Sequence, residues 1–445
     1  MPEGRWSDVS DTQRGVASLS GYRSWRAAPR AAVSVLLLHL IFEYLRIHEL
    51  WPVLGKLRVQ TAITAVLLVI VLTQTGKAGV RLTRQGWLLL GFLGLTVFTI
   101  LPAINNFYAY QFSYDLTLML IGYFAITHIL QNERDLTRFL SLLVGIHIYL
   151  ALRVTLNYKP SFDEAGYVMG FKAGTSFLGD ENDVALAMVL ILPFALYLFR
   201  QARSLAGRLF WGTGGIAILL SIILTHSRGG FVGLIAMVLC VVATSRNKKK
   251  AIGAVVLAAS LVLAVAPSQY WARIKTISDT DSGTAQARRN SWAAARRMFY
   301  DSPIWGVGGN NFGVLLPDYA LEFREEKRST QWARVAHSMY FDLLAEFGLI
   351  GVWLVGLVLL RNFRDLRQVR SLRENGHCSA SIGLLADSLR VSWVGFLVPA
   401  AFLSVLQYPH LYYLTALTVV AHRLAIAESA EVWTEPVGAL ETTGG

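Results

Sequence analysis

The chain has few cysteines and few charged residues. Its 445 residues include two cysteines, Cys240 within an apolar run and Cys378 in an arginine-rich connector. Two thiols in such unlike surroundings exclude a disulfide framework and a cysteine metal cage. Charged residues make up 16% of the chain, whereas ordinary globular chains carry about 25%. This shortage of charge argues against a soluble enzyme, and the chain contains no internal repeat or low-complexity tract.

Hydrophobic residues make up 54% of the chain and gather in runs long enough to cross a hydrocarbon layer of roughly 30 Å. The runs are continuously apolar, whereas membrane strands would alternate, so they predict helices. We therefore predict an all-α, polytopic membrane helix bundle of about 12 transmembrane helices, with one long external loop carrying short helices. The predicted spans are 31–49, 57–75, 87–104, 112–131, 138–157, 184–200, 208–225, 230–245, 250–267, 338–360, 384–406 and 409–425.

The formal net charge of +12 does not indicate a nucleic-acid partner, because the basic residues lie between the apolar runs and form no single basic face. Alternate segments hold 20 of them, five between 361 and 373 alone, whereas the short segments between hold six. The positive-inside rule then predicts that both termini are cytoplasmic. The predicted order is a cytoplasmic tail (1–30), nine spans (31–267), a long external loop (268–337), three spans (338–425) and a second cytoplasmic tail (426–445).

The long loop at 268–337 is the connector most suited to a function, because loops of this length in compact proteins are more often functional than idle. Its stretch from Ala285 to Tyr300 predicts a short amphipathic helix with Trp292 and Met298 on the apolar side. A helix of this kind suits the interface between membrane and water. A second outer loop, 158–183, is rich in acidic residues.

Arg228 lies in a polar turn, Thr225-His226-Ser227-Arg228-Gly229-Gly230, between two apolar runs. An arginine at the membrane boundary requires an anionic partner or a wet cavity, and the adjacent glycines would let a ligand approach the backbone. A second interpretation is that the long side chain simply extends to the interface.

Arginines also cluster at Arg288 and Arg289, one turn before Trp292. Guanidinium groups bind phosphate oxygens in pairs, so such a cluster suits a diphosphate. The alternative is a solvated basic face.

His337 lies where the long loop re-enters the membrane. A histidine there could accept a proton from a substrate in an aqueous cavity, or it could simply bond a loop carbonyl. Asp342 and Glu346 follow one turn apart on the same predicted helix, which argues against a glycosidase pair and favours structural roles, such as partners for loop arginines. Asp387 and Arg390, three residues apart in the eleventh span, are interpreted as an internal pair.

Three motifs together resemble the O-antigen ligase and polymerase superfamily, in the right order between about 179 and 360. They are Ser227-Arg228-Gly229-Gly230, then Arg288-x-x-x-Trp292 with Asp301-Ser302-Pro303-Ile304-Trp305-Gly306-Val307-Gly308, and then His337-x-x-Tyr340 with Glu346-x-Gly348-x-x-Gly351. The segments Gly179 to Asp183 and Thr284 to Gln286 look closest to the branch associated with exosortase-linked O-glycosylation. Ser338 departs from the family, in which asparagine is common at this position.

The resemblance implies a metal-independent, inverting glycosyltransferase of the bacterial inner membrane that uses no cofactor. Its donor would be a glycan on undecaprenyl diphosphate, and its acceptor a hydroxyl of a lipid, glycan or protein at the periplasmic face. Arg228 and Arg288 would hold the diphosphate, and His337 would activate or orient the acceptor. The substrate-binding residues would be Asn182, Ser227, Arg289, Tyr340 and Glu346.

A transporter or flippase of lipid-linked sugars is the alternative, since many helices with few charges would also suit transport. Transporters, however, usually place their polar groups near the midplane between paired repeats. The choice between ligase and polymerase stays open, because the two differ only in their acceptor.

Overall fold

The computed structural model describes residues 29–47, 51–75, 82–157, 161–162, 168–169, 178–245, 247–266, 268–275, 283–320 and 334–432. Most of both predicted tails and much of the loop at 158–183 therefore lie outside the described residues.

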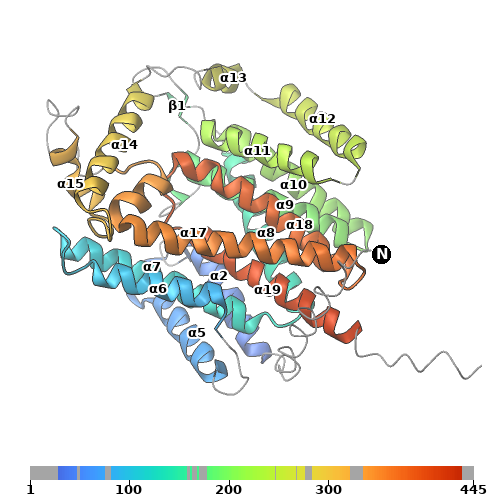
Figure 1. Cartoon of the computed structure of the whole chain (residues 1–445). Helices are drawn as coiled ribbons and strands as arrows, with labels where there is room; N and C mark the ends of the chain where they lie inside the picture. Colours follow the sequence, from blue (N-terminus) through green and yellow to red (C-terminus); the bar gives the residue numbers. More distant parts are fainter. Residues whose placement is uncertain are drawn as a thin grey trace, which may run out of the picture.

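Helices form almost all of the regular structure (Figure 1). Many begin at a Ser, Thr, Asn or Asp whose side chain accepts a hydrogen bond from the first turn, as Asn105, Asn132 and Ser379 do. The helices are α2 (Arg30–Leu45), α4 (Pro52–Lys56), α5 (Val59–Thr75), α6 (Arg84–Phe98), α7 (Asn106–Ile129), α8 (Glu133–Leu156), α9 (Glu181–Gln201), α10 (Leu205–Leu224), α11 (Arg228–Thr244), α12 (Lys248–Val265), α13 (Ser268–Lys275), α14 (Gly283–Asp301), α15 (Phe312–Tyr319), α17 (Met339–Glu374), α18 (Ala380–Leu397), the short 3₁₀ helix η4 (Pro399–Phe402) and α19 (Pro409–Val432).

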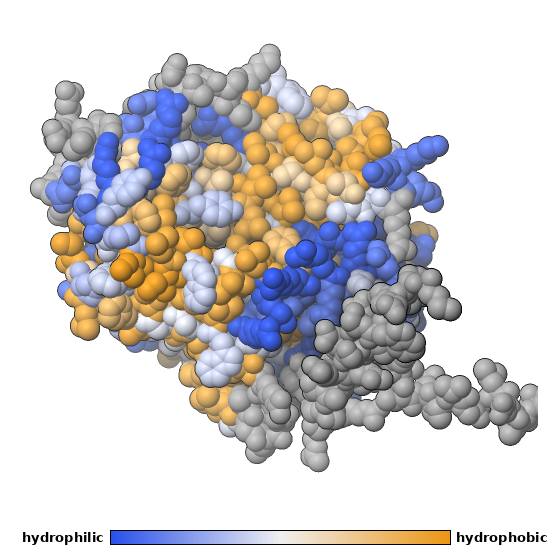
Figure 2. All heavy atoms as spheres, in the orientation of Figure 1, coloured by the Kyte–Doolittle hydropathy of each residue, from blue (hydrophilic) through white to orange (hydrophobic). Residues whose placement is uncertain are grey.

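Each of the twelve predicted spans contains a helix. Six stretches are long and apolar enough to cross a membrane, namely α7, α8, α9, α10, α17 and the run Ala380–Phe402. Shorter apolar helices lie within α5, α6 and α11. Figure 2 shows hydrophobic side chains over the middle of the molecule, between a hydrophilic region at α14 and others at the right-hand ends of α12 and α17. The chain is a polytopic, all-helical membrane protein, and the count of twelve spans stays a prediction.

The core is built around α9, which packs against α8, α10, α11 and α18. The longest helix, α17, packs against α6, α14, α18 and α19. Helices α9, α11 and α17 all begin at the same end of the bundle, and loop-borne α14 lies beside the start of α17 at that end (Figure 1). We refer to this end of the bundle as the cavity end and to the other end as the opposite end.

The structure departs from the sequence prediction in several places. Helix α17 continues to Glu374, so the arginine-rich connector after residue 360 is helical, stabilised by ion pairs one turn apart between Arg361 and Asp365 and between Arg370 and Glu374. The eleventh helix ends at Leu397, because proline cannot continue it, and η4 follows. A two-stranded antiparallel hairpin, β1 (Ser161–Phe162) and β2 (Val168–Met169), lies in the acidic outer loop.

The predicted pairing of Asp387 with Arg390 is wrong. Asp387 instead forms an ion pair with Arg373 of α17, with 2.6 Å between Nη1 of the arginine and Oδ2 of the aspartate. The arginine of a neighbouring helix lies closer to this carboxylate than the one on its own helix. The contact fastens α17 to α18 at the opposite end.

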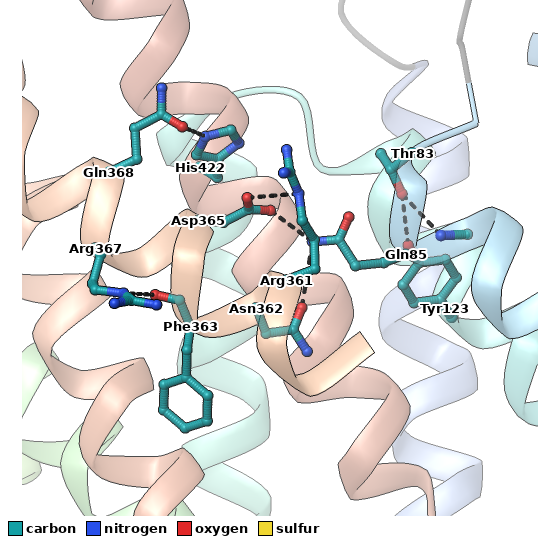
Figure 3. A network of polar contacts seen from close by, with 11 residues as sticks. Thr83, Gln85, Tyr123, Arg361, Asn362, Phe363, Asp365, Arg367, Gln368 and His422 are labelled. Atoms are coloured by element: carbon teal, nitrogen blue, oxygen red, sulfur yellow. Dashed lines mark hydrogen bonds and ion pairs between the residues drawn. The ribbon is translucent and has the colours of Figure 1, made fainter. Parts of the chain in front are cut away.

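A buried polar network joins α6, α17 and α19 (Figure 3). Gln85 donates to the carboxylate of Asp365 at 2.6 Å and to Asn362 at 3.4 Å, and Asn362 donates to Thr415 at 3.0 Å. Asp365, which is 4% exposed, also pairs with Arg361 at 3.1 Å. These contacts fix the position of α17 along its axis relative to α6 and α19. They lie far along α17 from the cavity end.

Replacing Asp365 by alanine is expected to destabilise the protein by about 1–3 kcal/mol, because the buried amide of Gln85 and the guanidinium of Arg361 lose their acceptor. Thermal unfolding in detergent measures the effect. Gln368→Ala, which removes an exposed bond to His422, is the control and should change the melting temperature little. Equal shifts for the two variants would contradict a stabilising role for this network.

Candidate functional site

A cavity of about 460 Å³ lies at the cavity end of the bundle. Five segments far apart in the sequence form its wall: the start of α9, the turn before α11, α14, the residues before α17, and the end of η4. The wall carries three guanidinium groups, two imidazoles and one carboxylate. The lining residues are Glu181, Asn182, His226, Arg228, Gly229, Ala287, Arg288, Ser291, Arg334, Val335, His337, Phe402 and Leu403.

Two helix N-termini point into this cavity, those of α9 and α11. Asp180 caps α9 by accepting from the backbone N–H of Asn182 at 2.8 Å, and Ser227 caps α11 by accepting from Gly230 at 3.0 Å. The Asn182 side chain joins the two caps, because its amide donates to Asp180 at 2.7 Å and its carbonyl accepts from Ser227 at 2.7 Å. The positive ends of both helix dipoles therefore face the same cavity, an arrangement that favours an anion.

Arg228 is the first residue of α11 and lines the cavity half-buried. The two glycines after it have different roles. Gly229 lines the cavity, as expected for close approach of a ligand. Gly230 instead packs against α9, where an added Cβ would lie 2.6 Å from that of Ala185. The second glycine is needed for helix packing.

Arg288 enters the cavity from α14, one turn before Trp292. The amphipathic helix predicted here is confirmed, but its apolar side packs on protein, with Met298 buried in a small cluster that includes Phe312 and Leu316. Trp292 stacks on Phe341 of α17, with ring centroids 5.2 Å apart, and its Nε1–H donates to the Ala336 carbonyl at 2.9 Å. Trp292 therefore holds α14 against the residue that precedes His337.

His337 lies immediately before α17 with a left-handed backbone, at φ 51°. This conformation is uncommon for a residue with a side chain. Its side chain lines the cavity together with Arg228 and Arg288. Partial removal from water lowers the pKa of His337 below its ordinary value of 6.5, the positive charges of Arg288 and Arg334 lower it further, and Asp180 opposes the shift. The imidazole is therefore neutral and able to accept a proton at neutral pH.

His226 and Arg334 also line the cavity, and neither was singled out from the sequence. His226 shares the left-handed conformation, at φ 52°, and its ring lies 6.0 Å from that of Tyr270. The polar turn at 225–230 was a signal for His226, since a polar residue between two apolar runs needs a polar environment. Arg334 had no comparable signal, because it follows a stretch of mixed charge.

Four of the predicted site residues are not among the lining residues, namely Ser227, Arg289, Tyr340 and Glu346. Ser227 instead caps α11 and donates to Asn182. The Tyr340 hydroxyl donates to the Leu397 carbonyl at 2.7 Å, which ties α17 to α18. Glu346 is 6% exposed and accepts from the backbone N–H of Phe312 at 3.1 Å. Arg289 is exposed and donates to Gln286 of its own helix. A part for these residues in substrate binding stays a prediction, and Glu346 takes the structural position expected for its carboxylate.

The glycines of the last two motifs fix the long loop against α17. Helix α17 is interrupted at Gly348, where φ is 55°, and backbone N–H groups at 307, 308, 349 and 350 bond across to the facing chain. An added Cβ on Gly306 would lie 2.3 Å from the backbone of Glu346, and one on Gly348 would lie 2.7 Å from that of Ile304. These glycines position the loop that carries α14, and so Arg288, against the start of α17.

Within the part of the chain that the structure describes, no group of three or more His, Cys, Asp or Glu side chains is arranged to hold a metal ion.

The fold and the cavity define a multi-pass membrane protein with a cationic site at one end of its helix bundle. Residues 213–356 match the family model described as O-antigen ligase, a family of glycosyltransferase-type enzymes. The family transfers lipid-linked glycans in reactions of ligase or polymerase type. The matched segment includes Arg228, Arg288 and His337 but begins after Asn182. A comparison with curated proteins gave no match.

The bond from Trp292 to the Ala336 carbonyl gives a prediction about positioning. Trp292→Phe keeps an aromatic ring against Phe341 but removes the donor, so the rate of glycan transfer is expected to fall about 3- to 10-fold. The family resemblance implies that His337 accepts the proton of the acceptor. In that role, the low-pH limb of activity should also move toward 6.5, because His337 would no longer be held beside Arg288.

The matched control for this variant is Trp305→Phe, at a tryptophan 39% exposed whose ring packs against Phe98. Its activity and pH profile should stay unchanged. A slower Trp292→Phe enzyme with an unmoved pH limb would show that Trp292 only supports the fold.

Proposed function

We propose that this protein transfers a glycan from undecaprenyl diphosphate to an acceptor hydroxyl at the periplasmic face of a bacterial inner membrane. The observation that carries the proposal is that Arg228, Arg288 and His337, from three separate segments, line one cavity. The basic residues at the opposite end of the bundle support a cytoplasmic position for that end and for both termini.

In the proposed reaction, the acceptor hydroxyl attacks the anomeric carbon from the side opposite the diphosphate. The bond between that carbon and the diphosphate oxygen breaks, and the configuration inverts. The departing diphosphate gains negative charge, which Arg228, Arg288 and the two helix N-termini can stabilise. The hydroxyl proton passes to His337, whose neutral imidazole is prepared to accept it.

The arginines supply the positive charge that a divalent metal would otherwise bring to a lipid diphosphate, so the proposal includes metal independence. The long polyprenyl tail requires a lipid-facing path, which a membrane-embedded enzyme provides. The charged groups that line this cavity lie at one end of the bundle rather than at its midplane, which favours transfer over transport.

The test is transfer from a purified undecaprenyl-diphosphate glycan to a hydroxyl acceptor, by the full chain in nanodiscs with EDTA present. Product is expected without added metal. Product that requires Mg²⁺ or Mn²⁺ would overturn the metal-independent mechanism. No product with lipid, glycan and protein acceptors, together with movement of labelled carrier across sealed vesicles, would overturn transfer and favour a flippase.

A further inference from the structure

A second cavity, of about 850 Å³, lies toward the opposite end of the bundle. Its walls are mainly apolar side chains of α9, α10, α11, α12 and α18, including Pro193, Trp211, Met237, Val241 and Val391. The surface over α12 is hydrophobic and ends at a hydrophilic patch on its right-hand side in Figure 2. We refer to this cavity as the apolar groove. Two of these helices, α9 and α10, are candidate membrane spans, and α18 lies within a third.

Cations gather at one end of the apolar groove. Arg200 lies in the last turn of α9, Lys250 in the first turn of α12, and Arg370 and Arg373 near the end of α17. We refer to these four residues as the basic rim. All of them lie at the opposite end of the bundle, since α9 and α11 start at the first cavity and run toward this end.

Two members of the basic rim are neutralised by carboxylates. Arg370 pairs with Glu374 at 3.0 Å, and Arg373 pairs with Asp387 at 2.6 Å. Among the described residues, Arg200 and Lys250 form no ion pair, and both side chains are exposed. The groove thus presents two exposed cations at the mouth of a long apolar slot.

This combination matches the chemistry of an anionic phospholipid. The acyl chains of the phospholipid would lie along the apolar wall. Its phosphate would lie between the two cations, beside the N–H groups of the first turn of α12. The polyprenyl tail of a glycan donor fits the groove less well, because its diphosphate would occupy the first cavity and leave the basic rim without an anion.

We propose that the apolar groove binds one diacyl phospholipid with an anionic headgroup, taken from the leaflet at the opposite end of the bundle, with its phosphate between Arg200 and Lys250. The site is separate from the cavity for glycan transfer, and it holds whether or not the proposed transfer reaction is correct.

Native mass spectrometry of the purified full chain tests this, with dioleoyl phosphatidylglycerol and dioleoyl phosphatidylcholine as probes and no glycan donor present. The two lipids share acyl chains and differ in net headgroup charge. Wild-type protein is expected to retain one phosphatidylglycerol in preference to phosphatidylcholine. The double variant Arg200→Gln, Lys250→Gln should lose about thirtyfold in phosphatidylglycerol affinity. Each cation near a membrane surface contributes a factor of about five to the affinity for an anionic lipid.

The matched control is Arg203→Gln with Lys248→Gln, which removes two exposed cations from the same helix ends but outside the groove lining. Its affinity for phosphatidylglycerol should stay unchanged. Equal losses in the two double variants would overturn the site, because they would indicate diffuse attraction to the basic end. A wild-type protein without headgroup preference would overturn it too.

Gly215→Phe tests the apolar wall. Gly215 lines the groove, and a Cβ there meets Ala195 at an ordinary 3.7 Å, so the ring can extend into the groove without forcing α9 and α10 apart. Loss of the bound phosphatidylglycerol at an unchanged melting temperature is expected. Continued retention, or a co-purified polyprenyl lipid that the same variant displaces, would overturn the proposed occupant.

Discussion

Replacing His337 by alanine is expected to lower the rate of glycan transfer about 10²- to 10⁴-fold, the usual contribution of a positioned proton acceptor. His337 lines the cavity together with both arginines and is neutral at working pH. The residual rate should be independent of pH in the acid range, because the group that titrates there has been removed. Initial rates with a purified lipid-diphosphate donor measure the loss.

Two comparison variants distinguish a base from a general loss of structure. His377→Ala removes a histidine from the connector at the opposite end and should leave transfer unchanged. His226→Ala removes the other imidazole that lines the cavity. Loss of the acid limb in His226→Ala, with the limb kept in His337→Ala, would assign the proton to His226 and contradict the role of His337.

The pH profile has an expected direction. Transfer requires the neutral imidazole, so activity should fall as pH drops through the pKa of His337 and hold at higher pH. Removal from water and the charges of Arg288 and Arg334 lower that pKa, so the limb should lie below 6.5. In Arg288→Gln one of these positive charges is gone, and the limb of the residual activity should move up toward 6.5. An unmoved limb would mean that the titrating group is not His337.

Much of the fold could be predicted from the sequence because span length and hydrophobicity are local properties. Each predicted span contains a helix. The eleventh span was predicted to run to residue 406, but its helix ends at Leu397, two residues before Pro399, which has no N–H to continue it. Partners between helices were harder to predict. Spacing on one helix predicted an ion pair between Asp387 and Arg390. Asp387 pairs with Arg373 of α17 instead, and only the packing of the two helices shows which arginine lies closer.

The candidate site was partly predictable for the same reason. Residue types marked Arg228, Arg288 and His337 as chemically unusual, and the family resemblance supplied their shared role. Spacing alone could not bring them together, because the cavity depends on the loop fixed at Gly306 and Gly348. Glu346 was predicted both as a structural carboxylate and, from its place in a motif, as a substrate-binding residue. Its carboxylate accepts from the backbone N–H of Phe312, a contact that spacing could not indicate.

Replacing Arg228 or Arg288 by alanine is expected to lower transfer about 10²- to 10³-fold, as the loss of one charge-stabilising group does elsewhere. Both line the cavity half-buried, and they approach it from α11 and α14. Lysine at either position keeps the charge but loses the forked pair of donors, so it should restore only part of the rate. Arg296→Ala, an exposed arginine of α14 outside the lining, is the matched control and should stay active.

The double variant decides whether the two arginines hold one diphosphate. Groups that act on the same leaving group are not additive, so Arg228→Ala with Arg288→Ala should lose less than the product of the two single losses. A fully multiplicative loss would mean that they act on separate parts of the substrate, for example one on the diphosphate and one on the glycan. Normal transfer in both single variants at normal protein level would contradict any diphosphate role, and the cavity would then have to bind its anion through Arg334 and the N-termini of α9 and α11.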